Sequence, residues 1–527
     1  MISYMVLTLA GAVYAGTPPC ESLKSMSQPD VTITAAEMVP AGPYTAPAAG
    51  GAPLAPAPAR GPAPTAGAPG GGRGRGQGPA AGPVLPAHCR VAAVLKPSSD
   101  SAIEMEVWLP AENWNGKFQA VGNGGWAGTI SYAAMASALR EGYATASNDT
   151  GHKGGSGQFA MGHPEKVVDF GYRAMHEMTL KSKALISAFY DRAPRLSYYN
   201  GCSTGGRQGL MEAQRYPEDF DAIIAGAPVY NQIRLHAAQM AKQIEVLNDQ
   251  TRMVPREKIT LLANAVLAAC DAKDGVKDGI VSDPETCTFD PSVLLCKSGD
   301  AATCLTAPQV ESVRHAYAPV KTKSGEVVYP GSALGFEAGW RMPQDGAPPA
   351  IALDSFRYLG RQDANWNGMS FDLDADLALA VKNAGYIDAI DPNLAKFKAR
   401  GGKLLLYHGW ADPGPAPANT IHYYSEVVRT LGPKQENWMR LFLLPGVGHC
   451  GGGPGPDQAD FVSAIERWRE SGAAPDQILA SHVTNNRIDM TRPLCPYPQV
   501  AQYKGIGSTN DAANFVCKAP AKVNGSN

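Results

Sequence analysis

The sequence lacks the features that mark a protein binding nucleic acid or spanning a membrane. Its 46 Lys and Arg residues nearly balance 48 Asp and Glu residues, the net charge is −2, and no run of like charge occurs. Beyond the N-terminal region, no segment approaches the ~20 apolar residues that a transmembrane helix needs. We therefore expect a soluble mature protein that binds neither nucleic acid nor a membrane, and whose partners are small molecules or other proteins.

Cysteine is present in an even number, ten, and no CxxC motif occurs. Closely spaced pairs are Cys270 with Cys287, Cys296 with Cys304, and Cys495 with Cys517. Without CxxC or histidines clustered beside these pairs, zinc binding is disfavoured, and the short spacings predict disulfides. We expect Cys20 and Cys89 to be disulfide-bonded too. Because disulfides persist outside the reducing cytosol, the sequence predicts a secreted or periplasmic protein.

Two segments near the N-terminus are expected to lie outside the folded core. Residues 1–15 contain an apolar stretch followed by a small-x-small pattern, which suggests the remnant of a signal peptide, although no Lys or Arg precedes it. The alternative is a buried or disordered N-terminal segment. Residues 44–85 are almost wholly Ala, Pro and Gly. This insert has too little apolar side chain to offset the entropy of ordering, so we predict that it is disordered.

Short apolar runs predict the strands of a largely parallel sheet. These runs are residues 102–109, 117–121, 143–147, 195–200, 222–226, 403–408 and 440–444. Helical spacing is found at residues 169–190 and 207–215. The continuous apolar character of the later strands is typical of a sheet covered on both faces. Between residues 230 and 398 the pattern breaks, which predicts an inserted lid.

A G-x-S-x-G motif stands between a predicted strand and a predicted helix. Residues 201–205 read GCSTG, with Ser203 at the centre. In this position the motif forms a tight turn that exposes the serine at the carboxyl end of the sheet, and the glycines remove Cβ atoms that would clash. The alternative is an ordinary glycine-rich turn. The context favours an α/β-hydrolase fold, with a catalytic domain built from residues 16–229 and 399–527 and a lid formed by residues 230–398.

A nucleophilic serine needs a base and a carboxylate that orients the base. In this fold the acid and then the histidine follow the serine in the chain. Asp412 comes directly after the strand predicted at 403–408, and His449 comes directly after the strand predicted at 440–444. We therefore predict Ser203, His449 and Asp412 as nucleophile, base and orienting acid.

Other residues could replace members of this triad. His408 precedes the acid, His422 lies inside a helix-like run, and Asp457 would reverse the chain order. Glu212, near the nucleophile, is interpreted as a solvated helix residue.

Two cysteines flank the predicted catalytic residues. Cys202 immediately precedes Ser203, and Cys450 immediately follows His449. A disulfide between them would tie the two catalytic loops together. The alternative, in which Cys202 is itself the nucleophile, would leave Cys450 unpaired.

The set Cys202-Ser203, Asp412 and His449-Cys450 resembles the CS-D-HC motif of the tannase and feruloyl esterase family, whose members include mono(2-hydroxyethyl) terephthalate hydrolases. The similarity extends from about Cys20 to Cys517 and is interrupted mainly by the Ala/Pro/Gly insert. The resemblance implies a serine esterase with a large lid, acting on esters of aromatic carboxylic acids such as ferulate, gallate or related phenolics. The alternatives are a general carboxylesterase and a catalytically silent binding module.

The oxyanion of an ester intermediate needs two backbone donors. Thr204, directly after the nucleophile, is expected to supply one. The glycine-rich stretch at residues 122–128 follows an early strand, and the resemblance implies Gly124 or Gly125 as the second donor.

An acidic loop suggests a structural metal ion. Residues 271–280 read DAKDGVKDGI, and the carboxylates of Asp271, Asp274 and Asp278 with the carbonyls of Val276 and Ile280 would suit Ca²⁺. The alternative is a solvated acidic turn. The resemblance implies structural calcium in this lid loop, and no organic or redox cofactor is expected.

Aromatic substrates would be recognised by the lid. Residues Phe356, Tyr358 and Trp366 are available to stack, and Arg357 or Arg361 could pair with a carboxylate. The same aromatic residues could instead form the core of the lid.

Overall fold

The computed structural model describes residues 19–44, 84–340 and 347–519. The possible signal remnant at 1–15 and nearly all of the Ala/Pro/Gly insert lie outside the described residues. Within the described part of the chain, no helix combines the length and the apolar character needed to cross a bilayer.

A nine-stranded mixed sheet forms the centre of the protein, in the order β1-β4-β5-β7-β6-β8-β9-β12-β13. Its strands are β1 (Val31–Val39), β4 (His88–Leu95), β5 (Ile103–Pro110), β6 (Lys117–Val121), β7 (Ala144–Asn148), β8 (Leu196–Cys202), β9 (Ala222–Gly226), β12 (Lys403–Gly409) and β13 (Met439–Leu444). The pairs from β7 to β13 are parallel, whereas β1, β4, β5 and β7 pair in antiparallel fashion. The carboxyl ends of the parallel strands therefore meet at one edge.

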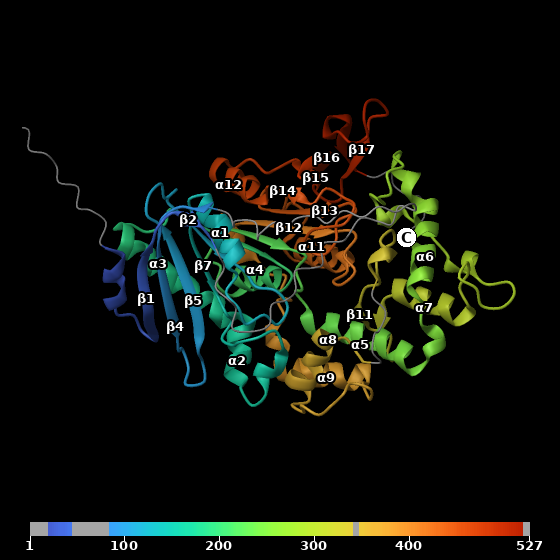
Figure 1. Cartoon of the computed structure of the whole chain (residues 1–527), viewed down its shortest axis with the longest axis horizontal. Coiled ribbons are helices and arrows are strands. Elements are labelled where there is room, and N and C mark those ends of the chain that lie inside the picture. Colours follow the sequence, from blue (N-terminus) through green and yellow to red (C-terminus); the bar gives the residue numbers. More distant parts are fainter. Residues whose placement is uncertain (1–18, 45–83, 341–346, 520–527) are drawn as a thin grey trace, which may run out of the picture.

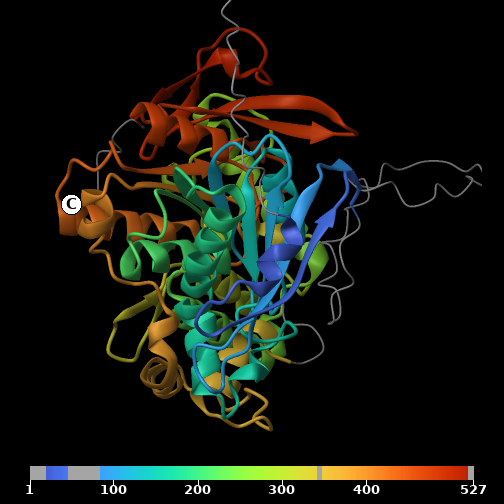
Figure 2. The same cartoon turned by 90° about the vertical axis from the view of Figure 1, so that its left-hand side faces the viewer.

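Helices cover both faces of the sheet, as Figures 1 and 2 show. The α-helices are α1 (Tyr132–Arg140), α2 (Pro164–Val168), α3 (Ala174–Tyr190), α4 (Thr204–Arg215), α5 (Gln232–Asn248), α6 (Arg256–Cys270), α7 (Ala307–Tyr317), α8 (Ala350–Asp354), α9 (Leu373–Ala384), α10 (Ala395–Ala399), α11 (Pro417–Leu431) and α12 (Phe461–Ser471). Leu404 and Leu406 of β12 belong to the cluster that contains α3, α4 and α11 residues, whereas Leu405 packs with Trp468 of α12. Alternate residues of one apolar strand are thus buried on opposite faces.

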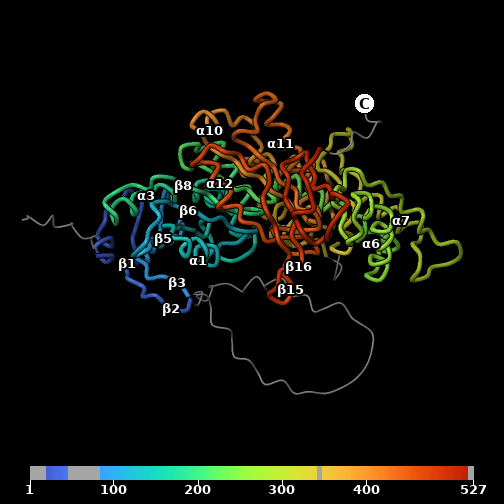
Figure 3. The backbone as a smooth tube through the Cα atoms, turned by 90° about the horizontal axis from the view of Figure 1, so that it is seen from above, coloured from blue at the N-terminus to red at the C-terminus, as the bar shows by residue number. Residues whose placement is uncertain are grey.

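The chain between β9 and β12 leaves the sheet and returns to the neighbouring strand position. This insertion, residues 227–402, contains α5 to α10 and includes the segment 230–398 that the sequence predicts as a lid. One apolar cluster packs α5, α8 and α9 residues against Trp126 and Phe170 of the sheet region, and another lies among α6 and α7 residues. In Figures 1 and 3, α6 and α7 lie at the end of the molecule opposite β1.

In the part of the chain that the structure describes, nine further strands form smaller sheets. They are β2 (Gly42–Pro43), β3 (Val84–Leu85), β10 (Val320–Lys321), β11 (Val327–Tyr329), β14 (Gln458–Ala459), β15 (Ile478–Thr484), β16 (Arg487–Leu494), β17 (Val500–Tyr503) and β18 (Phe515–Lys518). The C-terminal strands β14 to β18 form a layer beside α12 (Figure 1).

Five disulfides are present in the described chain. They join Cys20 to Cys89, Cys202 to Cys450, Cys270 to Cys287, Cys296 to Cys304, and Cys495 to Cys517. The sequence predicts all of these cysteines to be disulfide-bonded, including Cys20 and Cys89. No described cysteine is free.

The helix expected at residues 169–190 is present and continues a helical run that begins with α2 at Pro164. A π-helical turn occupies Asp169–Arg173, and the α-helix α3 follows from Ala174 to Tyr190. The carboxylate of the buried Asp169 accepts hydrogen bonds within this turn, from Arg173 Nε at 2.6 Å and from the Ser101 hydroxyl at 3.2 Å.

Candidate active site

Ser203 occupies the sharp turn between β8 and α4. Its backbone has φ of 65° and ψ of −123°, a conformation that few non-glycine residues adopt. Glycine is required beside it, because a Cβ atom on Gly201 would lie 2.7 Å from the carbonyl carbon of Gly205. A Cβ atom on Gly205 would lie 2.9 Å from the Asn123 oxygen. The turn thus places Ser203 at the carboxyl edge of the sheet, directly before the helix N-terminus.

Asp412 and His449 meet at the same edge. Asp412 follows β12 and His449 follows β13, which is the parallel neighbour of β12. His449 Nδ1 lies 2.6 Å from Asp412 Oδ2. The Asp412 side chain is fully buried, whereas 34% of the His449 side chain is exposed. The acid is therefore shielded from water while the imidazole remains accessible to a ligand.

The environment of Asp412 favours the ionised carboxylate. Burial opposes ionisation, but hydrogen bonds from His408 and His449 outweigh it and lower the pKa of Asp412 to about 2. The second oxygen, Oδ1, accepts the amide of Gly414 at 2.9 Å. The carboxylate can thus hold one His449 tautomer and stabilise the imidazolium that forms when His449 takes a proton.

The alternative residues have other contacts. His408 is fully buried, with Nε2 3.1 Å from Asp412 Oδ2 and Nδ1 2.7 Å from Thr420 Oγ1. His422 lies exposed on α11. Asp457 accepts the Gly452 amide at 2.7 Å. Among these alternatives, His408 is the residue that contacts Asp412, through the same carboxylate oxygen that His449 contacts.

The Cys202–Cys450 disulfide joins the loops of Ser203 and His449, with 6.0 Å between the two Cα atoms. A free thiolate is needed for nucleophilic attack. Because Cys202 is oxidised, the alternative that assigns it as the nucleophile does not fit this structure. The bond restricts the separation of Ser203 and His449, since each residue is covalently adjacent to it.

The glycine-rich loop after β6 lies against the start of α4. Thr204 Oγ1 donates a hydrogen bond of 3.0 Å to the Gly125 carbonyl. Gly125 has a φ of +56°, and a Cβ atom on Gly124 would meet no atom within 4 Å. Thr204 is the first helical residue, so its amide has no intrahelical acceptor. The structure thus brings the predicted donor loop and Thr204 together.

The insertion packs on this loop. Trp126 Nε1 donates to the Ile351 carbonyl at 2.9 Å, and the Ile351 side chain lies 3.5 Å from the Cβ position of Gly125. Asp354 Oδ2 accepts the Ser156 hydroxyl at 2.7 Å and the Gly157 amide at 2.9 Å. Helix α8 therefore borders the same loop as the candidate oxyanion donors.

The aromatic residues suggested for substrate stacking lie in the core of the insertion. Phe356, Tyr358 and Trp366 are all buried in one apolar cluster. Arg361 Nε pairs with Asp376 Oδ1 at 2.7 Å, and Arg357 Nε donates to the Trp366 carbonyl at 2.7 Å. These side chains build the insertion itself, which is the alternative that the sequence leaves open.

The acidic loop after α6 carries Asp271, Asp274 and Asp278, but among the described residues their carboxylate oxygens do not all lie within 4.8 Å of one another. Burial raises the pKa values of Asp274 and Asp278, and the neighbouring carboxylates, including that of Asp271, raise them further. Such a buried group of like charges has the chemistry that a hard cation stabilises. Part of the charge is balanced within the protein, because Asp278 Oδ2 pairs with Arg492 Nη2 at 2.6 Å.

The two residues expected to offer carbonyl ligands are buried in this loop. The Val276 amide donates to Asp274 Oδ1 at 2.9 Å, and the Ile280 amide donates to Asp278 Oδ1 at 3.1 Å. These bonds fold the loop tightly but occupy carboxylate oxygens. The residue types fit calcium, and calcium in this loop remains a prediction.

Glu212 does not have the solvated position that the sequence suggests. It is 1% exposed. The interpretation is wrong because α4 packs against β8 and β9 on one side and against α3 on another, so little of the helix faces water. Glu212 lies close to His176 and Asp219. Among the described residues, these three form the one group of His, Cys, Asp or Glu side chains whose potential metal-ligand atoms all lie within 4.8 Å of one another.

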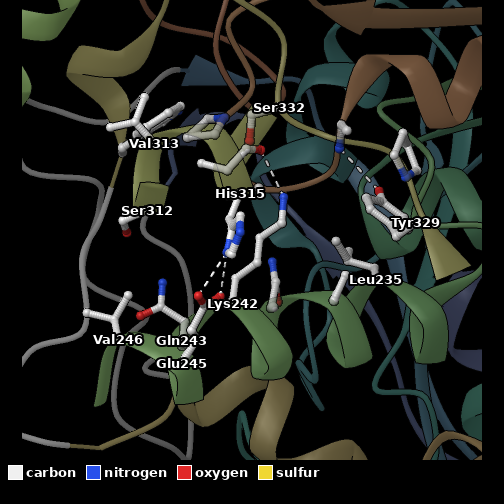
Figure 4. Close-up of a pocket in the computed structure, with 18 of the residues that line it drawn as sticks. Leu235, Lys242, Gln243, Glu245, Val246, Ser312, Val313, His315, Tyr329 and Ser332 are labelled. Carbon is white, nitrogen blue, oxygen red and sulfur yellow. Dashed lines mark hydrogen bonds and ion pairs between the residues drawn. The ribbon is translucent and has the colours of Figure 1, made fainter. Parts of the chain in front are cut away.

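A separate cavity of about 150 Å³ lies in the insertion between α5, α7 and the loop after Asp412 (Figure 4). Its wall includes Pro413 but neither Ser203 nor His449. Lys242 Nζ donates to the Ala316 carbonyl at 2.9 Å, and burial lowers the pKa of Lys242 to about 8. The cavity is therefore distinct from the Ser203 turn.

Sequence comparisons give a consistent family assignment. A family model described as "Tannase and feruloyl esterase" matches residues 89–518. An uncharacterized esterase of Xanthomonas campestris pv. campestris is 36% identical over 97% of this chain and 92% of its own length. A probable feruloyl esterase B-2 of Aspergillus terreus is 34% identical over 81% of this chain and 86% of its own.

Structural comparisons agree. Feruloyl esterase B from Aspergillus oryzae superposes with a TM-score of 0.83 at 30% identity, covering 95% of this chain and 99% of its own. Tannin acyl hydrolase from Aspergillus niger has a TM-score of 0.72 at 22% identity, covering 96% and 94%, and shows the shared fold. The α/β-hydrolase prediction is confirmed.

Proposed function

The chain belongs to the tannase and feruloyl esterase family, and on that premise we propose that it is a secreted serine esterase acting on esters of aromatic carboxylic acids. A carboxylic ester hydrolase activity of the feruloyl esterase and tannase type follows from family membership. The serine mechanism, the acyl-enzyme, the choice of aromatic acid and the secretion are the proposed parts.

The observation that carries the proposal is the disulfide beside the triad. It joins the residue before Ser203 to the residue after His449, while His449 Nδ1 contacts Asp412 at 2.6 Å. Ser203 Oγ attacks the ester carbonyl carbon as His449 Nε2 takes the hydroxyl proton. The amides of Thr204 and Gly125 stabilise the tetrahedral oxyanion.

Collapse of this intermediate breaks the bond to the alcohol, which leaves with the proton from His449. Water then loses a proton to His449 and attacks the acyl-enzyme, releasing the carboxylic acid and restoring the Ser203 hydroxyl. Asp412 stays ionised throughout, which its low pKa supports.

Feruloyl, galloyl and terephthalate-type esters are the proposed substrates. The relative named feruloyl esterase B-2 supports the first of these, and the sequence resemblance alone suggests the others. Helix α8 beside the donor loop supports a lid role for the insertion, in which Asp271, Asp274 and Asp278 hold calcium structurally. Five disulfides support an extracellular location.

Hydrolysis of methyl ferulate, methyl gallate, mono(2-hydroxyethyl) terephthalate and p-nitrophenyl butyrate by the oxidised protein tests the proposal. We expect turnover of aromatic-acid esters and a loss of about 10⁴-fold or more in Ser203→Ala. Ser471→Ala, an exposed serine on α12, is the control. Cleavage of the butyrate alone would identify a general carboxylesterase. No cleavage would favour a binding module, and an active Ser203→Ala variant would exclude the nucleophile.

A further inference from the structure

His176, which is partly buried, and the buried Glu212 and Asp219 form a cluster away from the candidate active site. His176 lies on α3, Glu212 lies on α4, and Asp219 lies in the turn that leads to β9. Helices α3 and α4 pack together on one face of the sheet (Figure 1). One ligand atom from each residue lies within 4.8 Å of the other two. The cluster thus combines one nitrogen donor with two carboxylates.

The carboxylates of this cluster have unsatisfied oxygens. Glu212 and Asp219 are each 1% exposed. Within the described structure, Glu212 Oε1, Glu212 Oε2 and Asp219 Oδ1 have no hydrogen-bond partner. A buried carboxylate without partners costs several kcal/mol, so these atoms require a ligand or a proton.

The nearby cations do not satisfy these atoms. Lys183 Nζ donates to the Asp219 backbone carbonyl, not to its carboxylate. Arg400 Nε donates to the Pro217 carbonyl at 3.1 Å, and its Nη2 donates to the Glu218 carbonyl at 3.5 Å. Neither Lys183 nor Arg400 therefore bonds any of the three unpaired carboxylate oxygens.

A shared proton would satisfy the cluster only in part. A proton on Glu212 donated to Asp219 Oδ1 would serve two oxygens and leave the third unpaired. A metal ion can be bound by both carboxylates and by the histidine together. We propose that His176, Glu212 and Asp219 bind one divalent transition-metal ion, for which Zn²⁺ is the probe.

The donor set and its orientation favour zinc over calcium. Imidazole nitrogen with carboxylate oxygen suits Zn²⁺, whereas Ca²⁺ takes oxygen ligands. The His176 ring stacks on Tyr216 with centroids 3.6 Å apart, and its Nδ1 lies 2.6 Å from Asp219 Oδ2. Binding of Zn²⁺ by both atoms would displace the proton between them and, with Zn–N and Zn–O bonds of about 2.0–2.2 Å, would move the two atoms apart. Binding therefore releases protons and weakens at low pH.

The ion would have a structural role. Glu212 is eight residues beyond Thr204 on α4, which corresponds to about 12 Å along the helix. Bound there, the ion would join α3, α4 and the turn before β9 toward the C-terminal end of α4, away from Ser203.

The test is a Zn²⁺ titration of full-length protein after chelation, with Ca²⁺ held constant and saturating so that the loop after α6 does not contribute. We expect about one equivalent of bound Zn²⁺ by calorimetry and elemental analysis, and a Tm increase of roughly 2–4 °C. Glu212→Gln and Asp219→Asn should each weaken binding at least about tenfold. Co²⁺ absorption of the wild-type protein gives an independent readout of nitrogen and oxygen ligation.

The matched control is His163→Gln. His163 Nδ1 contacts Asp100 Oδ1 at 2.8 Å, an exposed histidine–carboxylate pair on the surface. This variant should bind Zn²⁺ as wild type does, whereas His176→Gln should not. Absence of bound Zn²⁺, or unchanged affinity in Glu212→Gln and Asp219→Asn, would overturn the proposal and leave a shared proton as the account of the cluster.

Discussion

Two histidine–aspartate pairs with the same separation lie toward opposite ends of α4. His449 Nδ1 is 2.6 Å from Asp412 Oδ2, and His176 Nδ1 is 2.6 Å from Asp219 Oδ2. The first pair adjoins the N-terminus of α4 through the Cys202–Cys450 disulfide, and the second meets the helix at Glu212. Their surroundings differ more than their geometry does.

Around Asp412 every carboxylate oxygen has a partner, and the imidazole is accessible. Around Asp219 one oxygen has none, and a second buried carboxyl group lies beside it. Burial raises the pKa of Glu212 well above its usual value, and the nearby Asp219 raises it further. On our proposals, the pair whose carboxylate is fully hydrogen-bonded orients a catalytic base, and the pair with unpaired carboxylate oxygens binds a metal ion.

Exchange of the acid in each pair should separate the two roles most strongly. Asp412→Asn removes the charge that holds the His449 tautomer, and we expect kcat to fall by about 10⁴-fold. Asp219→Asn should leave kcat within about twofold, because that residue is remote from Ser203. Steady-state kinetics on an aromatic ester measure kcat of both variants. An equal loss of kcat in the two would show that Asp412 and Asp219 do not differ in their importance for catalysis.

Removal of disulfides should distinguish a catalytic restraint from a purely structural one. Cys202→Ala with Cys450→Ala frees the loops of Ser203 and His449, so kcat should fall about 100-fold. Stability should fall by about 5 kcal/mol, since the bond closes a separation of 248 residues.

The comparison variant is Cys296→Ala with Cys304→Ala, which opens a separation of only 8 residues. Its expected cost is about 2–3 kcal/mol with kcat unchanged. Denaturant unfolding measures the stability of both double variants, and steady-state kinetics measure their kcat. Comparable kcat values in the two would show that the Cys202–Cys450 disulfide does not hold the loops of Ser203 and His449 for catalysis.

Stability should respond to pH with opposite signs in the two regions. The pKa of Asp412 is lowered to about 2, so its contribution of about 2 kcal/mol is present above the unfolded value of 3.8 and is lost as pH falls toward 2. The pKa of Glu212 is raised, so metal-free protein loses stability as pH rises above the unfolded value of 4.5.

Thermal unfolding of chelated protein between pH about 2 and about 8 should show both losses of stability. Asp412→Asn should reduce the loss at acidic pH. Glu212→Gln should reduce the loss above pH 4.5 and raise the stability at neutral pH. If the stability of Glu212→Gln depends on pH as that of the wild type does, the Glu212 carboxyl does not have a raised pKa in the folded protein.

The smallest effect concerns the oxyanion loop. Thr204→Val removes the hydrogen bond to the Gly125 carbonyl, which should cost about 1 kcal/mol and lower kcat/KM roughly 3–10-fold. Thr260→Val removes an exposed bond of 3.2 Å to the Arg256 carbonyl and should leave kcat/KM unchanged. Equal kinetics for the two variants would argue against a positioning role of Thr204.

Much of the sheet could be predicted because its strands are locally apolar. The strands expected at 117–121 and 222–226 are β6 and β9 with the same bounds. Strands β1 and β4 were not anticipated, although residues 88–95 form an apolar run and residues 31–39 carry partial alternation. They flank the Ala/Pro/Gly insert and pair with each other across it, a long-range contact that local spacing does not indicate.

In the candidate site, sequence order was informative where the chain itself sets the geometry. The turn at Ser203 is a local structure, and Asp412 and His449 follow adjacent parallel strands whose ends must meet. His408 illustrates the limit. Its chain position suggests an alternative base, whereas its contact with Asp412 depends on how the loop after β12 folds back.

The sequence by itself determined the turn at Ser203, the order of Asp412 and His449 after adjacent strands, and the cysteines available for disulfides, because these depend on neighbouring residues and on the regular alternation of strand and helix. The tertiary structure alone decided that Glu212 is buried, that Phe356 and Trp366 form the core of the insertion, and that His176 reaches Asp219. These outcomes depend on which helix faces pack together, and such contacts join residues far apart in the chain.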